Sequence, residues 1–400
     1  MTPQESPLYG QLVLPSLDAH LRADLLPLEA QDRIRSCPAA SGLSRTTPAI
    51  DAQPLLSFCS NDYLGLSAHP ALAAAAAAAI ARSGFGAGAS RLISGDLPEH
   101  RELEDSLAEF LDVEAVLLFP SGYQTNLGVL CALAGPGDLI LCDHANHASI
   151  IDACRLSRAR PAFYRHLDLS SAEKRLLTLA PAARRTLLVT ESLFGMDGDV
   201  APLAELATLA GKHGAALLVD EAHALGVLGP GGRGLCHEAG VRPDILVGTL
   251  GKAFGAAGGF AAGSATLRKY LVNRSRTFIF TTAPPPPLAA AALAALHIIR
   301  GDEGQARRNA LVDRVLQLRM RLTSKAPLLP RSPILPIILG MDRAAVDASR
   351  ALRANGFFVQ PIRPPTVPEG TARLRVTLSA SHRPKDVDSF AQALAPLIPQ

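Results

Sequence analysis

Short apolar runs alternate with longer amphipathic stretches through the middle of the chain. Each run spans four to six residues and is apolar on both faces, which is typical of strands buried in a parallel sheet. Strands are predicted at residues 115–119, 139–142, 186–190, 215–220 and 244–248, and helices at 126–133, 150–157, 203–213 and 267–273. This repeated alternation predicts an α/β fold with a mostly parallel sheet.

The two ends of the chain follow a different pattern. Before the first strand, helices are predicted within residues 12–35 and at 70–82 and 99–111. After a proline run, helices are predicted from 288 to beyond 299 and at 304–322, 344–355 and 384–394, with strands at 334–339 and 374–377. We therefore expect an N-terminal arm (1–55), a large domain (56–287), and a linking helix with a smaller α+β domain (288–400).

Composition and charge exclude several classes of protein. Hydrophobic residues make up 48% of the 400 positions, and 39 Lys and Arg residues stand against 36 Asp and Glu residues. Disordered chains combine low hydrophobicity with high net charge, and nucleic-acid-binding proteins usually carry a basic excess. We therefore expect a folded protein with no nucleic-acid partner.

The sequence also predicts a cytoplasmic location. The longest purely apolar run, residues 71–81, is shorter than the ~20 residues that span a bilayer. The first residues lack the basic and apolar regions of a signal peptide. The short apolar run therefore predicts no membrane partner. No two of the six cysteines form a C-x-x-C pair, so we expect reduced thiols.

Residues able to do chemistry follow the predicted strands. In open parallel sheets, ligands bind beyond the carboxyl ends of the strands. The residues in these places are Ser121, Gly122 and Tyr123; Asp143, His144 and His147; Glu191 and Ser192; Asp220, Glu221 and His223; and Thr249 and Lys252.

Lys252 and Asp220 suggest a cofactor. Small residues surround Lys252, so a ligand can approach closely and desolvate the amine, which frees it to form a Schiff base. Asp220 ends a strand that is apolar on both faces, so its carboxylate needs a cationic partner. A protonated pyridine nitrogen is such a partner, and the pair is known from pyridoxal-phosphate enzymes.

Two other features allow more than one interpretation. Residues 121–123 precede a predicted helix, whose first amides can hold a phosphate, but they also suit an ordinary turn. His147 suits a metal site with Asp143 and His144, a place in the core, or a stack on a cofactor ring. No zinc signature matches these residues, and we expect no metal.

Taken together, the motifs resemble the α-oxoamine synthases, a family of fold-type-I pyridoxal-phosphate enzymes. The matching pieces are Ser60-Asn-Asp-Tyr-Leu-Gly-Leu, Gly86-Ala-Gly-Ala-Ser-Arg-Leu-Ile-Ser-Gly, Ser121-Gly-Tyr, Asp143-x-x-x-His147-Ala-Ser, Met196-Asp-Gly-Asp, Val219-Asp-Glu-Ala-His, Thr249-Leu-Gly-Lys and Arg373-Leu-Arg-Val-Thr-Leu. The resemblance implies an aspartate-aminotransferase-like fold with a mostly parallel seven-stranded sheet. It also implies bound pyridoxal 5'-phosphate and a homodimer with the active site at the interface.

The resemblance assigns roles around the cofactor. Lys252 would bind it covalently and later move protons at the substrate's α-carbon. Asp220 would pair with the pyridinium nitrogen, which makes the ring an electron sink. His223 would contact the phenolic oxygen, and His147 would stack over the ring.

Further assignments concern the phosphate and the substrate. Backbone amides at Ser121, Gly122 and Tyr123, with Thr249, would hold the phosphate, and Thr281 or Thr282 would reach the phosphate of the neighbouring subunit. Arg375 would bind the amino-acid carboxylate as a bidentate fork, with Arg373 as the alternative and Asn61 nearby. The family usually has Ser where this chain has Gly195, and Ser192 or a water is the candidate replacement for that hydroxyl.

The likeness is strongest to the branch of the family that serves biotin synthesis. It implies a decarboxylating condensation of L-alanine with a pimeloyl thioester, of CoA or a carrier protein, giving 8-amino-7-oxononanoate and CO2. Two alternatives are a glycine-using member, such as 5-aminolevulinate synthase or 2-amino-3-ketobutyrate CoA ligase, and an inactive scaffold that keeps the fold.

Overall fold

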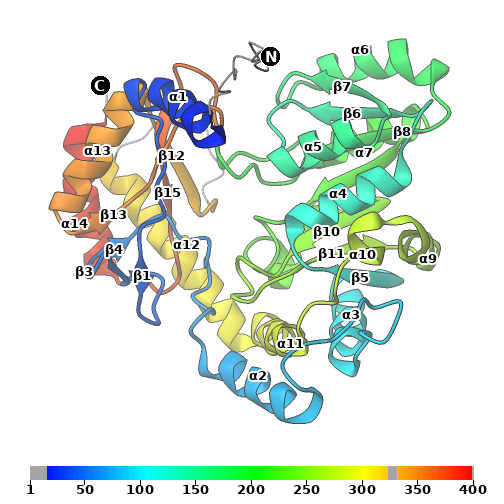
Figure 1. Ribbon diagram of the computed structural model, residues 1–400, viewed down its shortest axis with the longest axis horizontal. Coiled ribbons are helices and arrows are strands. Elements are labelled where there is room, and N and C mark those ends of the chain that lie inside the picture. The colour runs from blue at the N-terminus through cyan, green and yellow to red at the C-terminus, as the bar shows by residue number, and fades with distance from the viewer. Residues whose placement is uncertain (1–15, 323–330, 399–400) are drawn as a thin grey trace, which may run out of the picture.

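A seven-stranded sheet forms the centre of the computed structural model, which describes residues 16–322 and 331–398 (Figure 1). Its strands are β5 (Ala115–Phe119), β6 (Leu139–Asp143), β7 (Arg160–Tyr164), β8 (Thr186–Glu191), β9 (Ala216–Asp220), β10 (Ile245–Thr249) and β11 (Gly259–Gly263), in the order β5-β11-β10-β9-β8-β6-β7. β11 runs opposite to the other six strands of this sheet, which are parallel to one another. The mostly parallel seven-stranded sheet and the five predicted strands are confirmed.

Among the elements that the sequence prediction missed are two strands of the large sheet, β7 and β11, and helix α6 (Leu169–Leu179). β7 lies at the sheet edge with mostly exposed residues, so it lacks a continuous apolar run. β11 contains Gly and Ala apart from Phe260, residues that strands usually avoid. Helix α6 (Leu169–Leu179) buries only Ala172 and Leu176, so its polar surface hides the pattern.

Helices cover both faces of the sheet, which is the reason its strands are apolar throughout. On one face α4 (Gly122–Leu133), α5 (Ala148–Leu156), α9 (Ala265–Arg274) and α10 (Arg276–Ile279) pack on alternate strand residues such as Leu117 and Phe119. On the other face lie α3 (Pro98–Leu111), α6, α7 (Leu203–Lys212), α8 (Leu235–Glu238) and α11 (Pro286–Arg300), with α2 (Pro70–Ser83) against α11. Their core includes the strand residues of the opposite parity, such as Leu118, Leu141 and Val219.

A second, smaller sheet lies beyond the long helix α12 (Asp302–Leu322). Strands β12 (Ile334–Gly340), β15 (Ala372–Thr377) and β14 (Pro361–Ile362) pair antiparallel in that order, and α13 (Asp342–Ala354) and α14 (Pro384–Leu394) pack beside them. The N-terminal strands are β1 (Ala40–Ser41), β2 (Ala49–Ile50), β3 (Gln53–Pro54) and β4 (Leu56–Ser57), and β4 pairs with β13 (Phe357–Phe358).

The domain boundaries at 56 and 288 stay a prediction. Helix α11 contacts α2 and α3 on one side and α12 on the other, so it joins the two parts of the chain. β4 follows directly on the predicted N-terminal arm and pairs with β13 in a separate two-stranded sheet, so this part of the chain lies with the C-terminal part.

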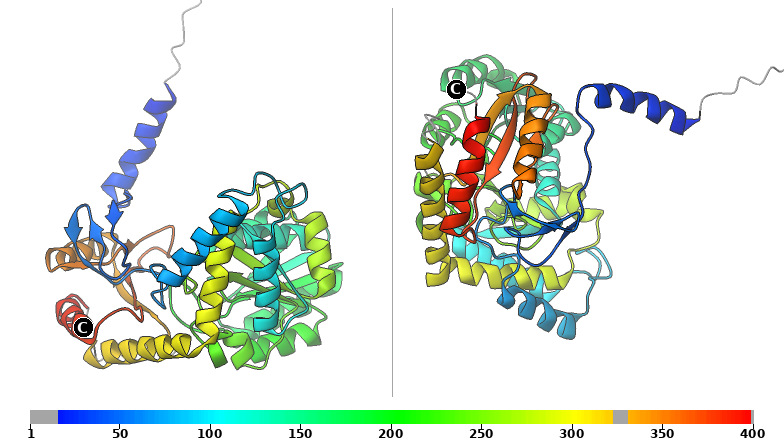
Figure 2. Two further views of the ribbon diagram at one scale, coloured as in Figure 1. Left: turned by 90° about the horizontal axis from the view of Figure 1, so that it is seen from below. Right: turned by 90° about the vertical axis from the view of Figure 1, so that its left-hand side faces the viewer.

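Helix α1 (Leu17–Ala30) stands away from the rest of the chain (Figure 2) and buries none of its residues. It falls within the predicted 12–35 segment, of which residues 12–15 lie outside the described part. Leu17, Leu21 and Leu25 are 74%, 51% and 45% exposed. Within residues 16–322 and 331–398, no helix combines the length and the apolar character needed to cross a bilayer.

Candidate functional site

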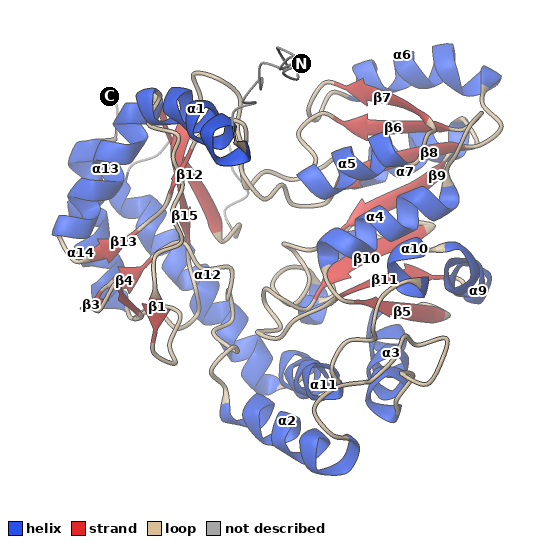
Figure 3. Cartoon of the chain, viewed as in Figure 1, coloured by secondary structure: helices blue, strands red, loops and turns tan. Residues whose placement is uncertain are grey.

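The polar residues at the strand ends meet on the side of the sheet that faces the smaller domain, toward which the arrowheads of β6 and β7 point in Figure 3. Lys252, three residues beyond β10, places its Nζ 2.8 Å from Nε2 of His223, three residues beyond β9. Neighbouring parallel strands end at one edge, so residues 29 positions apart along the chain become neighbours.

Lys252 occupies a desolvated position between opposing charges. Burial lowers the pKa of Lys252 to about 8, although the carboxylates of Asp220 and Glu191 favour the charged form. Arg375 adds a further lowering influence. Part of the amine is therefore neutral near physiological pH, as a nucleophilic lysine requires.

Asp220 is held rigidly at the end of β9 and is 5% exposed. Its Oδ2 accepts a 2.7 Å hydrogen bond from Asn126 Nδ2 of α4, and its Oδ1 accepts one from the Ala222 amide. Asn126 Oδ1 is buried without a hydrogen-bond partner among the described residues. Sequence reasoning missed Asn126, because only the docking of α4 on the sheet brings it to Asp220.

His223 is buried and neutral. Burial, Lys252 and Arg375 together hold the pKa of His223 well below its usual range. Its Nδ1 lies 2.8 Å from the hydroxyl of Tyr63, a fully buried residue that precedes α2. In the sequence, the only feature that marks Tyr63 as a site residue is its place in the Ser60-Asn-Asp-Tyr motif.

His147 caps the start of α5, and its Nδ1 lies 2.8 Å from Ser149 Oγ. Its backbone amide donates to Glu191 Oε1 at 2.5 Å. Burial, with Asp220 nearby, raises the pKa of Glu191 to about 8. The sequence predicts Glu191 at a strand end and assigns it no role, and the structure places it as the buried last residue of β8, held by the His147 amide.

The start of α4 suits an anion. Ser121 is the N-cap, and the amides of the first helical turn have no partner within the helix. A Cβ at Gly122 would lie 3.4 Å from Thr249 Oγ1, so the threonine hydroxyl lies beside these amides. The Tyr123 side chain points elsewhere, since its hydroxyl donates to Asp152.

The structure separates the two candidate arginines of β15. Arg375 donates through Nε to the Gly195 carbonyl, through Nη1 to Asn61 Oδ1 at 3.0 Å, and lies 3.4 Å from the Tyr63 hydroxyl. Arg373 instead pairs with Asp197. Arg375 is therefore the one that lies with Asn61, and its partners Gly195 and Tyr63 lie against His223, the neighbour of Lys252.

The remaining predicted residues lie in different surroundings. Ser192 is fully buried and donates to Glu221 Oε2 at 2.9 Å, so its hydroxyl is held by that carboxylate. A Cβ at Gly195 would clash with His223 Nε2, which explains why glycine fits here. Thr281 and Thr282 lie on a bend before α11, where Thr282 is exposed.

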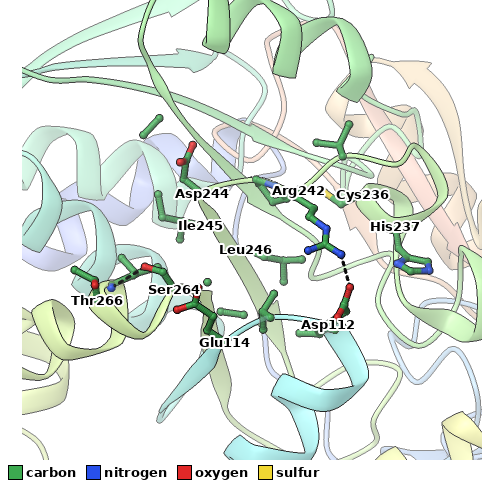
Figure 4. Close-up of a pocket in the computed structure, with 18 of the residues that line it drawn as sticks. Asp112, Glu114, Cys236, His237, Arg242, Asp244, Ile245, Leu246, Ser264 and Thr266 are labelled. Carbon is green, nitrogen blue, oxygen red and sulfur yellow. Dashed lines mark hydrogen bonds and ion pairs between the residues drawn. The ribbon is translucent and has the colours of Figure 1, made fainter.

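The opposite end of the sheet carries a pocket of about 820 Å³ (Figure 4). It is lined by residues at the start of β10 and the end of β11, and an Arg242–Asp112 ion pair lies within it. Because Lys252 follows the far end of β10, this pocket is separate from the site. Among residues 16–322 and 331–398, no three His, Cys, Asp or Glu side chains gather as a metal site.

The chain is similar to known proteins over most of its length. The sequence model of the aminotransferase class I and II family matches residues 53–394. The chain belongs to this family. It is 48% identical to the 8-amino-7-oxononanoate synthase of Anaeromyxobacter dehalogenans (strain 2CP-1), over 94% of this chain and 95% of that one. It is also 48% identical to that of Aromatoleum aromaticum, over 94% and 97%.

Solved structures agree with this assignment. A serine palmitoyltransferase from S. paucimobilis with a bound PLP–myriocin aldimine matches with a TM-score of 0.88 and 30% identity, over 94% of this chain and 96% of that one. An 8-amino-7-oxononanoate synthase from Francisella tularensis matches with a TM-score of 0.72 and 28% identity, over 86% and 97%. The resemblance to α-oxoamine synthases and to the fold-type-I architecture is confirmed.

The site residues fit pyridoxal phosphate. A desolvated lysine amine, a buried carboxylate for a cationic ring nitrogen, and free helix amides for a phosphate all face one region. These three groups complement the aldehyde, the pyridinium and the phosphate of that cofactor.

Proposed function

We propose that this chain is an 8-amino-7-oxononanoate synthase. With pyridoxal phosphate it condenses L-alanine with a pimeloyl thioester, of CoA or a carrier protein, and releases CO2. The carrying observation is the grouping of Lys252, Asp220, His223 and Arg375 in a chain 48% identical to synthases of that name.

Residues of this chain have separate roles around the cofactor and the substrate. Pyridoxal phosphate, when bound, supplies an electron sink for the carbanion at the substrate's α-carbon. Lys252 would hold the cofactor through its amine, and the same amine would move the proton at the substrate's α-carbon. Asp220 would pair with the protonated ring nitrogen, His223 would contact the ring's phenolic oxygen, and His147 would cover the ring face.

Arg375 orients the amino acid. Its guanidinium offers a planar fork to a carboxylate, and Asn61 and the Gly195 carbonyl hold that fork in place. Arg375→Lys should raise the KM for L-alanine at least tenfold, since Lys cannot make the bidentate contact. Arg373→Lys is the matched control, because Arg373 pairs with Asp197.

The enzyme is proposed to act as a homodimer in the cytoplasm. Phe85, Ile93 and Phe280 are 71%, 80% and 69% exposed. Their two segments are joined by a hydrogen bond from the Ala283 amide to the Ala89 carbonyl, and an exposed apolar patch marks an association surface. Phe280 adjoins Thr281 and Thr282, the residues expected to reach the partner's phosphate. Sedimentation of wild type against Phe280→Asp tests this, because a dimer should dissociate in the variant.

Substrate screening tests the proposed activity. Purified enzyme is incubated with pyridoxal phosphate, pimeloyl-CoA and either L-alanine, glycine or L-serine, and products are identified by mass. We expect 8-amino-7-oxononanoate from L-alanine. Strict use of glycine would favour the 5-aminolevulinate or 2-amino-3-ketobutyrate type of reaction. A protein that stays colourless with added cofactor would be an inactive scaffold.

A further inference from the structure

A charged cluster of three side chains lies behind the segment that contacts Arg375. His166 follows β7, and its Nδ1 lies 2.9 Å from Asp143 Oδ1 at the end of β6. Its Nε2 lies 2.9 Å from Asp199 Oδ2, in the segment that follows β8. The Asp143 side chain is 1% exposed, and those of His166 and Asp199 are 22% and 23% exposed. The cluster therefore joins two strand ends to a segment that follows a third.

Residues 193–200 form a tight hairpin, called here the substrate hairpin. Leu193 and Val200 pair antiparallel across it. The Phe194 amide donates to the Asp199 carbonyl at 3.0 Å, and the Phe194 ring meets the His166 ring edge to face at 4.4 Å. His166 therefore contacts both arms of the hairpin, one by an ion pair and the other by a ring contact.

The other side of the substrate hairpin faces β15 of the smaller domain. The Gly195 carbonyl accepts from Arg375 Nε, and Asp197 pairs with Arg373. Gly195 also lies directly against His223. A shift of the hairpin would consequently move the Arg375 fork relative to Lys252.

We propose that His166 is a positioning residue for the amino-acid substrate: by bridging Asp143 and Asp199 it fixes the substrate hairpin, and through it the guanidinium of Arg375. The inference rests on the proposed function, because it takes Arg375 as the ligand of the substrate carboxylate. His166 itself contacts neither substrate nor cofactor in this role.

The charges around His166 favour this bridge between Asp143 and Asp199. Both ring nitrogens can donate only in the protonated imidazole, and each faces a carboxylate. Burial opposes that charge, but Asp143 and Asp199 outweigh it and raise the pKa of His166 to about 10. The other titratable groups facing the cluster are His144, whose ring lies 6.0 Å away, and Tyr164, which lies near Asp143.

The test separates substrate placement from general stability. In the holoenzyme His166→Asn, the Kd for L-alanine is measured from the change in absorbance of the bound cofactor, beside the Kd for the cofactor itself. At metal sites, loss of a residue that orients a ligand typically weakens binding by about 10- to 100-fold. We expect a rise of that order in the Kd for L-alanine and a rise of less than threefold in the Kd for the cofactor. The KM for pimeloyl-CoA should stay within twofold of wild type.

His144→Asn is the matched control, because His144 lies 3.8 Å from the same Asp143 carboxylate but is 56% exposed. It should leave L-alanine binding within twofold of wild type. Asp199→Asn should weaken L-alanine binding selectively, and adding it to His166→Asn should cause little further loss, because both act through one contact.

Two results would overturn the inference. One is wild-type L-alanine binding in folded His166→Asn, and the other is an equal loss for cofactor and L-alanine. Should His166→Asn not fold, unchanged L-alanine binding in Asp199→Asn would overturn it equally. A wild-type enzyme with no response to L-alanine would instead contradict the proposed function.

Discussion

Gly259 offers a test of the phosphate-binding role of the α4 start. It begins β11, and a Cβ at this position would lie 2.6 Å from the Gly122 amide nitrogen and 2.5 Å from Thr125 Oγ1. That amide distance is about 0.8 Å short of ordinary van der Waals contact. Gly259→Ala must therefore displace the strand or the first turn of α4. Overpacking of this kind costs about 1–3 kcal/mol.

If the first turn of α4 moves, this free-energy cost weakens cofactor binding. An energy of 1–3 kcal/mol corresponds to a rise of about 5- to 150-fold in the dissociation constant. Titration of the cofactor-free variant with pyridoxal phosphate, followed by absorbance, measures this. Gly135→Ala, just beyond the other end of α4, places its Cβ in ordinary contact with the Ser157 carbonyl oxygen, at 3.9 Å, and should bind as wild type does. Wild-type affinity together with wild-type stability in Gly259→Ala would refute the reasoning, whereas lost stability with wild-type affinity would show that β11, and not the first turn of α4, had moved.

Three further predictions use the same titrations and equilibrium unfolding. Lys252→Ala should lose both the absorbance of covalently held cofactor and turnover, and full activity would contradict its role. Asn126→Ala removes a donor from the buried Asp220 carboxylate, so cofactor affinity should fall about 10- to 100-fold, and unchanged affinity would exclude the contact. Burial lowers the pKa of His382 to about 4, and its Nδ1 accepts from the Ser379 amide. Because the folded state resists protonation there, wild type should lose its stability advantage over His382→Gln as pH falls from about 6.5 toward 4; a constant difference would contradict this.

The strand pattern and the reactive groups could be predicted from local sequence. Buried parallel strands need continuous apolar runs, and the residues after them lie at the ligand-binding edge by topology alone. Lys252, Asp220, His147 and His223 follow from that rule. β7 and β11 do not, because one is an exposed edge strand and the other is built of small residues.

Contacts across long stretches of chain were decided only by tertiary structure. Arg373 and Arg375 lie two positions apart on β15, so the strand period places both on one face. Only the docking of the substrate hairpin pairs Arg373 with Asp197 and leaves Arg375 beside Asn61. Asn126 and Asp220 meet across 94 positions, and Tyr63 and His223 across 160. Residue type and position after a strand are local properties, so the sequence specifies which chemistry is available at the sheet edge. Tertiary packing decided which groups hold one another in place.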